Sequence, residues 1–301
     1  MRDTRKLLKQ NNFLGKYNRE RVFGIFAPLA RSGRATCAAE NLQQWPRSLK
    51  GVAGYPEDSD RYLGYSDYSQ LELRCIAAIT GDQFMCRAYK EGKDLHIMTA
   101  QILFDVETPT DVQRQIAKTC NFGLLYGCGV NVFMDILIKL ASLMLPHEEV
   151  QRLVRRWKNL FKQVNAWQEQ GIRAFKRGAL GSTPLGRAYK ADRITDHLNI
   201  ENQGFGAEVA KLAMHYAHDR LEAINAPIID FTHDSYKFDT YRDPGVYEEA
   251  AKILGDSMLE AWEQSIANTK VPDLPMPVTV RVGKNFGEIE KGIFVYEYKT
   301  V

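Results

Sequence analysis

The chain has 301 residues, of which 45% are hydrophobic and 26% charged, and its formal net charge is +3. These values are typical of a soluble globular protein with one large domain or two smaller ones. The small basic excess permits a nucleic-acid partner but does not by itself indicate one. No stretch approaches the roughly 18 consecutive apolar residues of a membrane-spanning helix, which argues against a membrane protein.

The N-terminal sequence MRDTRKLLKQNNFLGKY lacks the apolar core of a signal peptide. The five cysteines are odd in number and form no Cys-x-x-Cys pair, so neither a disulfide framework nor a zinc site is expected. We therefore expect a protein of a reducing, intracellular compartment.

The first clear element is a strand over residues 61–67, which ends at Asp67. The following sequence SQLELRCIAAIT predicts a helix, in which Ser69 and Glu72 have the spacing of a capping box. Further helices are predicted over about 110–126, 146–177, 205–224 and 247–267. The interval 178–195 is rich in turn residues.

Two more strands, IIDFT and YKFDT, predict a hairpin with His233, Asp234 and Ser235 at its tip, and VTVRVG (278–283) predicts another strand. The strands lie near both ends of the chain and the helices lie between them. This pattern predicts a mixed α+β fold, in which one sheet is assembled from distant segments around a helical insertion.

Asp67 ends a predicted strand and Asp234 lies at a predicted hairpin tip, and because 167 positions separate them, only the fold can bring them together. Two carboxylates that meet at a sheet edge can bind two Mg²⁺ ions, which prefer a few carboxylates together with phosphate oxygens and water. For either residue alone, a simple turn-forming role is the more common explanation.

A second candidate feature is a stripe along the helix predicted around 114–126, formed by Arg114, Lys118, Phe122 and Tyr126 at intervals of four. Two cations at one end of the stripe could grip a triphosphate, and two aromatic rings at the other could pack on a sugar and a base. An ordinary amphipathic helix shows the same pattern. Gly123 favours the functional interpretation, because a glycine inside a helix costs about 1 kcal/mol and often allows close approach of another group.

These segments resemble family A DNA polymerases, the class of bacterial DNA polymerase I. The matches to the A, B and C motifs of that family are DYSQLELR (67–74), RQIAKTCNFGLLYG (114–127) and His-Asp (233–234). Three further segments match in the same order: SGRATCAAENLQQWP (32–46), KDLHIMTA (93–100) and NIENQGFGAEVAKLAM (199–214).

The resemblance implies a polymerase palm, an antiparallel sheet with packed helices, into which a helical fingers subdomain is inserted. It places the palm in residues 1–84 and 196–301 and the fingers in residues 85–195, with residues 1–20 as a remnant of a thumb. It implies template-directed addition of deoxynucleotides to a primer 3′ end. The cofactors would be two Mg²⁺ ions, with Mn²⁺ as an alternative.

The resemblance also assigns residue roles. Asp67 and Asp234 correspond to the metal-binding catalytic aspartates, and Lys118 to a residue that holds the triphosphate and protonates the leaving pyrophosphate. The other residues assigned to the incoming nucleotide are Arg114, His96, Phe122, Tyr126, Glu72 and Gln70. The residues assigned to primer-template DNA are Arg34, Gln203, Asn199 and Gln43.

Five of these residues have more specific roles. Phe122 corresponds to the position that packs on the sugar, and Tyr126 to the tyrosine at the templating-base site. Glu72 corresponds to the position that blocks a ribose 2′-hydroxyl, a role that is compatible with the capping box. Arg34 and Gln203 correspond to readers of the minor groove, where the acceptor pattern is similar for all correct base pairs.

Two departures qualify these implications. The family usually has Glu where this chain has Ser235, which cannot add charge to the metal site. Only about 60 residues precede Asp67, so a thumb and an exonuclease domain are not expected in this sequence. We therefore expect weak binding to primer-template DNA. Either a second polypeptide supplies the thumb or exonuclease function, or the chain is a fragment, and we favour the second polypeptide. The expected place of action is the cytoplasm of a bacterial or phage-infected cell, at the nucleoid.

Two alternatives stay open. A related single-subunit RNA polymerase would carry Tyr in place of Phe122 and lack the Glu72 gate, so both residues favour DNA synthesis. A catalytically silent subunit that binds primer-template is suggested by Ser235 and the missing thumb. The presence of Asp67 and Asp234 together with the cationic stripe argues against it.

Overall fold

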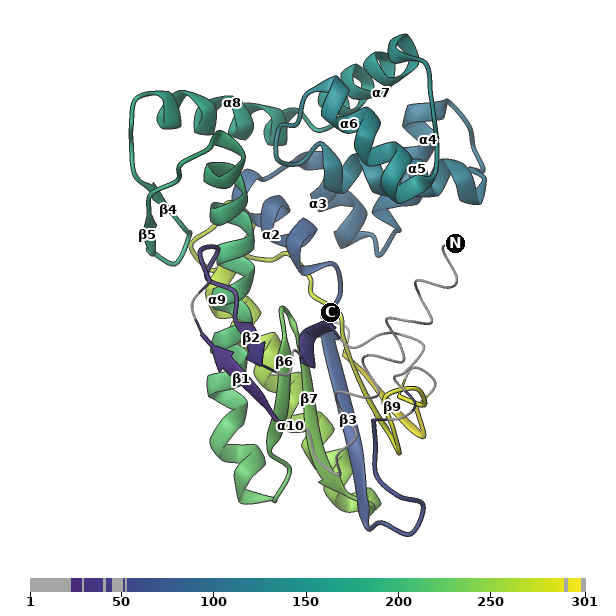
Figure 1. The fold of residues 1–301 in the computed structure, drawn as a ribbon, viewed down its shortest axis with the longest axis vertical. Helices are drawn as coiled ribbons and strands as arrows, with labels where there is room; N and C mark the ends of the chain where they lie inside the picture. The colour runs from purple at the N-terminus through teal and green to yellow at the C-terminus, as the bar shows by residue number, and fades with distance from the viewer. Residues whose placement is uncertain are drawn as a thin grey trace. The chain divides into compact units, whose positions relative to one another are not determined.

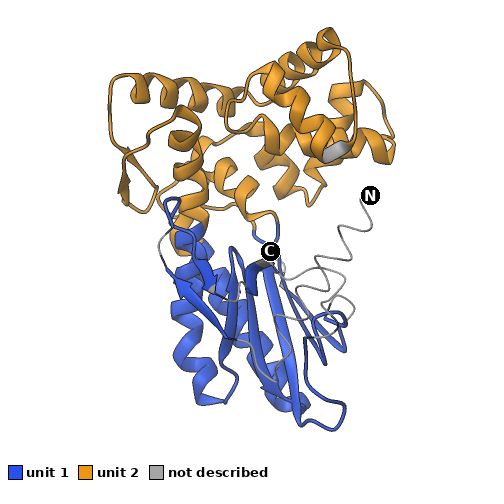
Figure 2. Cartoon of the chain, in the orientation of Figure 1, with its two compact units in different colours: residues 1–69, 207–262, 276–300 blue, residues 70–206, 263–275, 301 orange. Residues whose placement is uncertain are grey.

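The computed structural model describes residues 23–28, 30–39, 42–44, 51, 53–289 and 292–298. The chain divides into two compact units, coloured separately in Figure 2. Unit 1 comprises residues 1–69, 207–262 and 276–300, and unit 2 comprises residues 70–206, 263–275 and 301. The predicted thumb remnant, residues 1–20, lies outside the described residues, and the expected palm and fingers boundaries at 84/85 and 195/196 stay a prediction.

Unit 1 is built on a five-stranded antiparallel sheet with the order β6-β7-β3-β8-β9 (Figure 1). Its strands are β3 (Arg61–Tyr68), β6 (Ile228–Thr232), β7 (Ser235–Tyr241), β8 (Val278–Gly283) and β9 (Phe294–Tyr298). The early strand β3 lies between two strands from the last quarter of the chain. The predicted α+β fold with one sheet assembled from distant segments is therefore confirmed.

Successive side chains of each strand point to opposite faces of this sheet. On one face, Tyr68 donates its hydroxyl hydrogen to the carbonyl of Met258 (2.8 Å) in α10, which spans Pro244–Ile266. On the same face, Tyr236 donates to the carbonyl of Ala210 (2.6 Å) in α9, which spans Ile194–Ala223. Asp67 has the opposite parity on β3, so it lies on the face that these helices leave uncovered.

Gly64 explains why β3 can lie so close to β7. The two strands pair in a register that sets Gly64 opposite Phe238, and a Cβ at this glycine would lie 1.9 Å from the phenyl ring. The ring therefore occupies the space that any other residue would need. This packing fixes the same register that sets Asp67 opposite Ser235.

Unit 1 also contains a small hairpin of β1 (Gly24–Ala27) and β2 (Thr36–Ala39), followed by the short helix η1 (Leu42–Gln44). Lys211 of α9 donates hydrogen bonds to the carbonyls of Pro28 and Gly33 in the hairpin loop, the second at 2.6 Å. The loop is thereby tied to α9. No helix among the described residues is long and apolar enough to cross a membrane.

Unit 2 is mainly helical (Figure 1). Its elements are α2 (Leu71–Thr80), α3 (Gln83–Lys90), α4 (Leu95–Phe104), α5 (Asp111–Gly123), α6 (Val130–Ile136), η3 (Leu137–Ala141), α7 (His147–Leu160), α8 (Lys162–Lys176), and the strands β4 (Gly181–Ser182) and β5 (Ala188–Tyr189). The strands β4 and β5 form a hairpin in the predicted turn-rich interval. Helix α9 begins at residue 194, eleven residues before the predicted start.

The prediction of a single helix over residues 146–177 is wrong, because the helix is interrupted at Phe161, whose backbone is not helical (φ −99°, ψ 65°). Phe161 is buried against Phe84 and Trp157, with ring centroids 5.5 and 4.9 Å away. The buried carboxylate of Asp82 accepts a hydrogen bond from the backbone amide of Gln163 (3.2 Å) and so satisfies the first turn of α8. Hydrophobic periodicity continues across the break, which is why the sequence pattern does not reveal it.

The predicted capping box of Ser69 and Glu72 is also wrong. Helix α2 begins after Gln70, which has left-handed backbone geometry (φ 53°) and makes no side-chain capping bond. The helix predicted over about 110–126 begins as expected, with a capping box of Thr110 and Gln113, but it ends at Gly123. Tyr126 therefore lies in the turn after α5 rather than on the helical stripe.

Candidate active site

Asp67 and Asp234 lie on neighbouring strands of the unit 1 sheet. Asp67 pairs in register with Ser235, the residue that follows Asp234. Adjacent strands of a sheet are about 5 Å apart, so the two aspartates start from neighbouring backbone positions. Both side chains are half-buried. The register therefore places the two backbone positions close together at the end of the sheet, and the metal-binding role of their carboxylates stays a prediction.

The hairpin tip presents Asp234 through a tight turn at His233, whose φ of 60° lies in the left-handed region. The carbonyl of Thr232 accepts hydrogen bonds from the Asp234 amide (2.8 Å) and from the Ser235 hydroxyl (3.0 Å). These bonds stabilise the short loop between β6 and β7 and therefore fix the backbone position of Asp234.

The donor set fits a pair of hard divalent cations. Asp67 and Asp234 offer carboxylate oxygens only, and Mg²⁺ keeps several water or phosphate ligands beside one or two carboxylates. Burial, together with the negative charges of Asp67 and Asp234, raises the pKa of the neighbouring Tyr65 hydroxyl, which lies on the same sheet face as Asp67. Within the described residues, no group of three or more His, Cys, Asp or Glu side chains forms a complete protein-only metal site.

In unit 2, Asp94 joins Arg114 to the start of α4. One oxygen of its carboxylate accepts hydrogen bonds from the amides of His96 (2.8 Å) and Ile97 (3.1 Å). The other oxygen accepts from Nη2 of Arg114 at 2.6 Å. Burial alone would raise the pKa of Asp94, but these hydrogen bonds together lower it, so the carboxylate stays charged. Arg114 and His96 are thereby held side by side.

His96 is almost fully buried, and a hydrogen-bond network sets its tautomer. Trp157 donates from Nε1 to Oδ1 of Asn121 (3.0 Å), which leaves Nδ2 of Asn121 facing Nδ1 of His96 (3.0 Å). Because Nδ2 can only donate, Nδ1 of the imidazole accepts and Nε2 carries the hydrogen. Burial, with the charges of Lys118 and Arg114, lowers the pKa of His96 to about 4, so the ring is a neutral donor near pH 7.

This environment predicts a pH-dependent contribution of His96 to stability. The pKa falls from an ordinary 6.5 to about 4 on folding, so the contribution is present above pH 6.5 and is lost as the pH falls through 4. Urea unfolding at pH 7, 6, 5 and 4 should show the stability advantage of the wild type over His96→Gln shrink by at most about 3 kcal/mol. Parallel stability profiles of the two proteins would contradict the assigned neutral state.

Two other residues of the predicted stripe lie close to this group. Lys118 is exposed one turn after Arg114 on α5, and its charge reaches His96. The ring of Phe122 lies 5.8 Å from the imidazole of His96, centroid to centroid. The fold thus brings Arg114, Lys118, His96 and Phe122 into one group with two cations, one neutral donor and one aromatic ring.

Tyr126 belongs to a separate group, because its hydroxyl donates to the carboxylate of Glu72. Asn202 of α9 donates from Nδ2 to the Tyr126 hydroxyl (3.1 Å) and to the backbone carbonyl of Glu72 (3.0 Å). Gln70 lies two residues before Glu72, and its side-chain oxygen accepts a hydrogen bond from Tyr89 (3.3 Å). The glutamate predicted to be a sugar gate is therefore held by a tyrosine.

The predicted DNA-contacting residues lie in different elements. Asn199 and Gln203 are half-buried and one turn apart on α9. Arg34 lies in the β1–β2 hairpin loop, directly after Gly33, whose carbonyl accepts a hydrogen bond from Lys211. Gln43 donates its amide hydrogens to the carbonyls of Ala35 (3.2 Å) and Phe231 (3.1 Å). Gln43 thus connects the β1–β2 hairpin to β6 within unit 1, a structural role that the sequence did not suggest.

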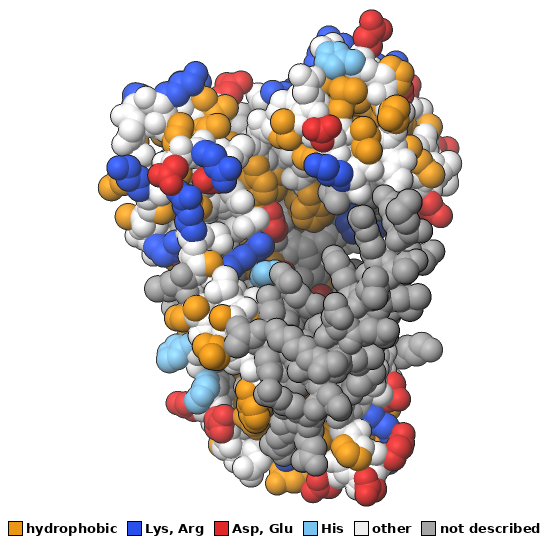
Figure 3. Space-filling model, viewed as in Figure 1, with side chains coloured by type: hydrophobic (Ala, Val, Ile, Leu, Met, Phe, Trp, Pro, Cys, Tyr) orange, Lys and Arg blue, Asp and Glu red, His pale blue; other side chains and the backbone are white. Residues whose placement is uncertain are grey.

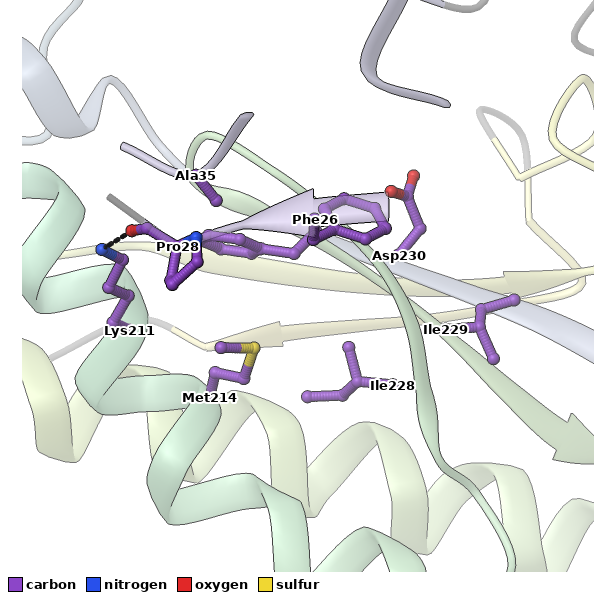
Figure 4. A pocket seen from close by; sticks show the side chains of 9 residues that line it. Phe26, Pro28, Ala35, Lys211, Met214, Ile228, Ile229 and Asp230 are labelled. Atoms are coloured by element: carbon purple, nitrogen blue, oxygen red, sulfur yellow. Dashed lines mark hydrogen bonds between the residues drawn. The ribbon is translucent and has the colours of Figure 1, made fainter. Parts of the chain in front are cut away.

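A cavity of about 340 Å³ opens beside the same hairpin. Figure 4 shows its lining, in which Phe26 and Ala35 face Met214 of α9 and Ile228 of β6, with Lys211 at one end. The lining is almost entirely apolar, so this cavity offers no obvious phosphate or metal site.

Basic side chains gather on two surfaces of unit 2. On α7, Arg152, Arg155 and Lys158 are exposed while Leu153 and Trp157 are buried, so the basic residues form a solvated face of this helix. Figure 3 also shows Lys and Arg side chains over the end of α8 and the β4–β5 hairpin. The exposed basic residues of that second surface are Arg173, Lys176, Arg177, Lys190 and Arg193.

Sequence reasoning missed several residues that hold the site. Asp94, Asn121 and Trp157 orient Arg114 and His96, and Asn202 orients Tyr126. Asp94 had a visible signal, because an Asp just before an apolar helical run is a typical N-cap. The others contact partners 25 to 130 positions away, and only the fold reveals such pairs.

Known proteins support the interpretation of this arrangement. The sequence profile of the family described as DNA polymerase family A matches residues 2–288. The chain is 32% identical to DNA polymerase I of Aquifex aeolicus (strain VF5) over 248 residues, 80% of this chain and 42% of that protein. It is 31% identical to the thermostable DNA polymerase I of Thermus aquaticus over 272 residues, 84% of this chain and 30% of that protein.

A solved structure, the POL domain of Pol1 from M. smegmatis in complex with DNA primer-template and dNTP, has the same fold. The TM-score is 0.80 at 23% identity, and the match covers 96% of this chain and 52% of that chain. The chain therefore spans between about a third and a half of these relatives. The profile match over nearly the whole sequence confirms the resemblance seen in the motifs, and the chain belongs to DNA polymerase family A.

Proposed function

We propose that this chain catalyses template-directed addition of deoxynucleotides to the 3′ end of a DNA primer. The observation that carries the proposal is the β3–β7 register, which sets Asp67 opposite Ser235 and therefore beside Asp234. Two Mg²⁺ ions, or Mn²⁺ in their place, would be held by these two carboxylates. When bound, such ions supply Lewis-acid activation of the 3′-hydroxyl and neutralise charge on the leaving pyrophosphate.

In this proposal, the triphosphate is bound by Arg114, Lys118 and His96. Arg114 donates from Nε and Nη2 to the carboxylate of Asp94, which uses one edge of its guanidinium. The remaining N–H groups can donate to phosphate oxygens. His96 donates from Nε2 as a neutral group, which adds a directed hydrogen bond without a further positive charge. Lys118 is exposed and flexible enough to follow the leaving pyrophosphate and to protonate it.

The sugar and the template are assigned to the aromatic groups. Phe122, next to His96, would pack on the deoxyribose, and the carboxylate of Glu72 would exclude a ribose 2′-hydroxyl. Tyr126 would lie at the templating base. Arg34, Gln203 and Asn199 would contact primer-template DNA. Gln43 would act there indirectly, since both of its amide hydrogens are used within unit 1.

Tight binding of the DNA duplex is expected to need more than these 301 residues. The chain spans 42% and 30% of two relatives, and phosphate contacts dominate nucleic-acid affinity. We propose that the remaining contacts are made by residues other than these 301, in the same polypeptide or in a partner chain that supplies thumb or exonuclease function. The 301 residues alone would then add few nucleotides per binding event.

Ser235 provides a test of the metal site. Its side chain lies on the same sheet face as Asp67, so Ser235→Glu would add a carboxylate beside the proposed ions. We expect this variant to reach half-maximal extension at a lower Mg²⁺ concentration than the wild type. Ser235→Gln, which has the same shape without the charge, serves as the control. An unchanged Mg²⁺ requirement in Ser235→Glu would count against the proposed ion position.

Primer extension tests the proposal as a whole. The full chain is incubated with a short primed template, Mg²⁺ and four deoxynucleoside triphosphates, beside reactions with chelator or unprimed template. Extension only with Mg²⁺ and a primer is the expected result. Intact primer-template binding without extension under any of these conditions would instead favour the silent subunit.

A further inference from the structure

Asn202 connects two residues that the proposed function assigns to nucleotide selection, although no motif in the sequence singled it out. Its Nδ2 atom lies 3.1 Å from the Tyr126 hydroxyl and 3.0 Å from the backbone carbonyl of Glu72. The Tyr126 hydroxyl in turn donates to the Glu72 carboxylate. The three residues come from α9, from the turn after α5 and from the first turn of α2, all within unit 2.

The donor and acceptor of each hydrogen bond among Asn202, Tyr126 and Glu72 are fixed by their chemistry. A backbone carbonyl only accepts, so the atom of Asn202 that faces Glu72 has to be the amide nitrogen. The single hydroxyl hydrogen of Tyr126 is used on the carboxylate, so the Tyr126 oxygen accepts from Asn202. An aliphatic side chain at position 202 could fill the space but could not make either bond.

The burial of Asn202 indicates that the two hydrogen bonds it donates explain why a polar residue occupies position 202. The side chain is fully buried, and its Oδ1 has no hydrogen-bond partner within the described part of the chain. A buried acceptor without a partner is unfavourable, because it loses its bonds to water and gains none in the protein. An aliphatic residue would avoid this cost, so the two donated bonds are the evident compensation.

We propose that Asn202 is a positioning residue for sugar discrimination. It holds the Tyr126 hydroxyl on the Glu72 carboxylate and so fixes the carboxylate that excludes a ribose 2′-hydroxyl. This inference rests on the proposed polymerase function and on the gate assigned to Glu72. It adds to that assignment a buried residue that does not touch the nucleotide.

The test compares kcat/KM for a deoxynucleotide and for the matching ribonucleotide in the wild type, Asn202→Leu, Tyr126→Phe and the double variant. Asn202→Leu should lower the preference for deoxynucleotides by about three- to tenfold, the effect of one lost neutral hydrogen bond. Most of the change should be faster ribonucleotide incorporation. The double variant should be about as selective as whichever single variant has the lower selectivity, and not less, because both changes act through the Tyr126 hydroxyl.

Asn131→Leu, at an exposed position of α6, is the matched control and should keep the wild-type preference. Thermal unfolding of each variant separates lost selectivity from lost folding. A folded Asn202→Leu with wild-type selectivity would overturn the proposal, and so would effects of Asn202→Leu and Tyr126→Phe that simply add. If Asn202→Leu does not fold, full selectivity in Tyr126→Phe overturns it. Absence of extension by the wild type is a separate result, which rejects the proposed function itself.

Discussion

Asp234→Asn should reduce Mg²⁺-dependent primer extension by roughly a thousandfold or more, because a neutral amide cannot replace a carboxylate that holds a divalent ion. The substitution keeps the shape of the side chain, and the turn at His233 depends on backbone geometry rather than on the Asp234 charge. Folding and primer-template binding should therefore be unchanged. Single-turnover extension measures the first effect, and fluorescence anisotropy with labelled DNA measures the second.

Asp219→Asn is a matched control for this experiment. Asp219 lies on α9 in the same unit, and its side chain is fully exposed. Its replacement removes the same charge without touching the sheet, so extension should proceed at the wild-type rate. Equal activity of Asp234→Asn and Asp219→Asn would show that the carboxylate at the hairpin tip does not hold a required ion.

Lys118→Ala should lower the rate of nucleotide addition by about a hundredfold, the typical effect of removing one charged group that stabilises the transition state. Lys118 is exposed and lies one turn from Arg114, so its loss should leave the helix intact and the Asp94–Arg114 pair in place. The effect should appear mainly in kcat, because the proposed proton transfer to pyrophosphate occurs during the reaction. Rapid-quench measurement of a single addition gives the rate directly.

Two further variants sharpen this second test. Lys118→Arg keeps the charge but donates a proton far less readily, so it should bind the nucleotide as the wild type does and leave the rate low. Lys176→Ala, at an exposed position near the end of α8, removes the same charge elsewhere in unit 2 and should be neutral. A wild-type rate in Lys118→Ala would exclude Lys118 as the proton donor.

Much of the fold follows from local sequence patterns. The alternating and β-branched runs that form β3, β6, β7 and β8 were predicted almost to the residue, since each strand is bounded by turn-forming residues. Their assembly into one sheet was also predicted, from the position of the strands at both ends of the chain. The prediction of Asp67 beside Asp234 depended only on where those strands end.

The errors arise where a tertiary contact overrides a local preference. Phe161 breaks a continuous helical pattern because its ring packs in a buried cluster and Asp82 caps the new helix. Ser69 does not cap α2 because the chain turns at Gln70 instead. Glu72 instead accepts a hydrogen bond from Tyr126, which lies beyond the end of α5. No local pattern contains this information.

The same distinction applies to the candidate site. The residues that would touch substrate lie in motifs that a sequence reader can match, such as Arg114 and Lys118. Asn121 and Asn202, which orient them, also lie in matched segments, but no local pattern reveals their roles, because their partners are distant in sequence. A polar residue at a buried position is informative only once its burial is known.

Single-nucleotide incorporation on four templates would test the central claim most directly. Each template presents a different base opposite the next primer position, and each of the four deoxynucleotides is supplied separately with Mg²⁺ to the full chain. The account predicts that only the complementary nucleotide is added efficiently on each template, and that Asp67→Asn and Asp234→Asn add none. Nucleotide addition that ignores the template base, or addition that persists in both aspartate variants, would contradict it.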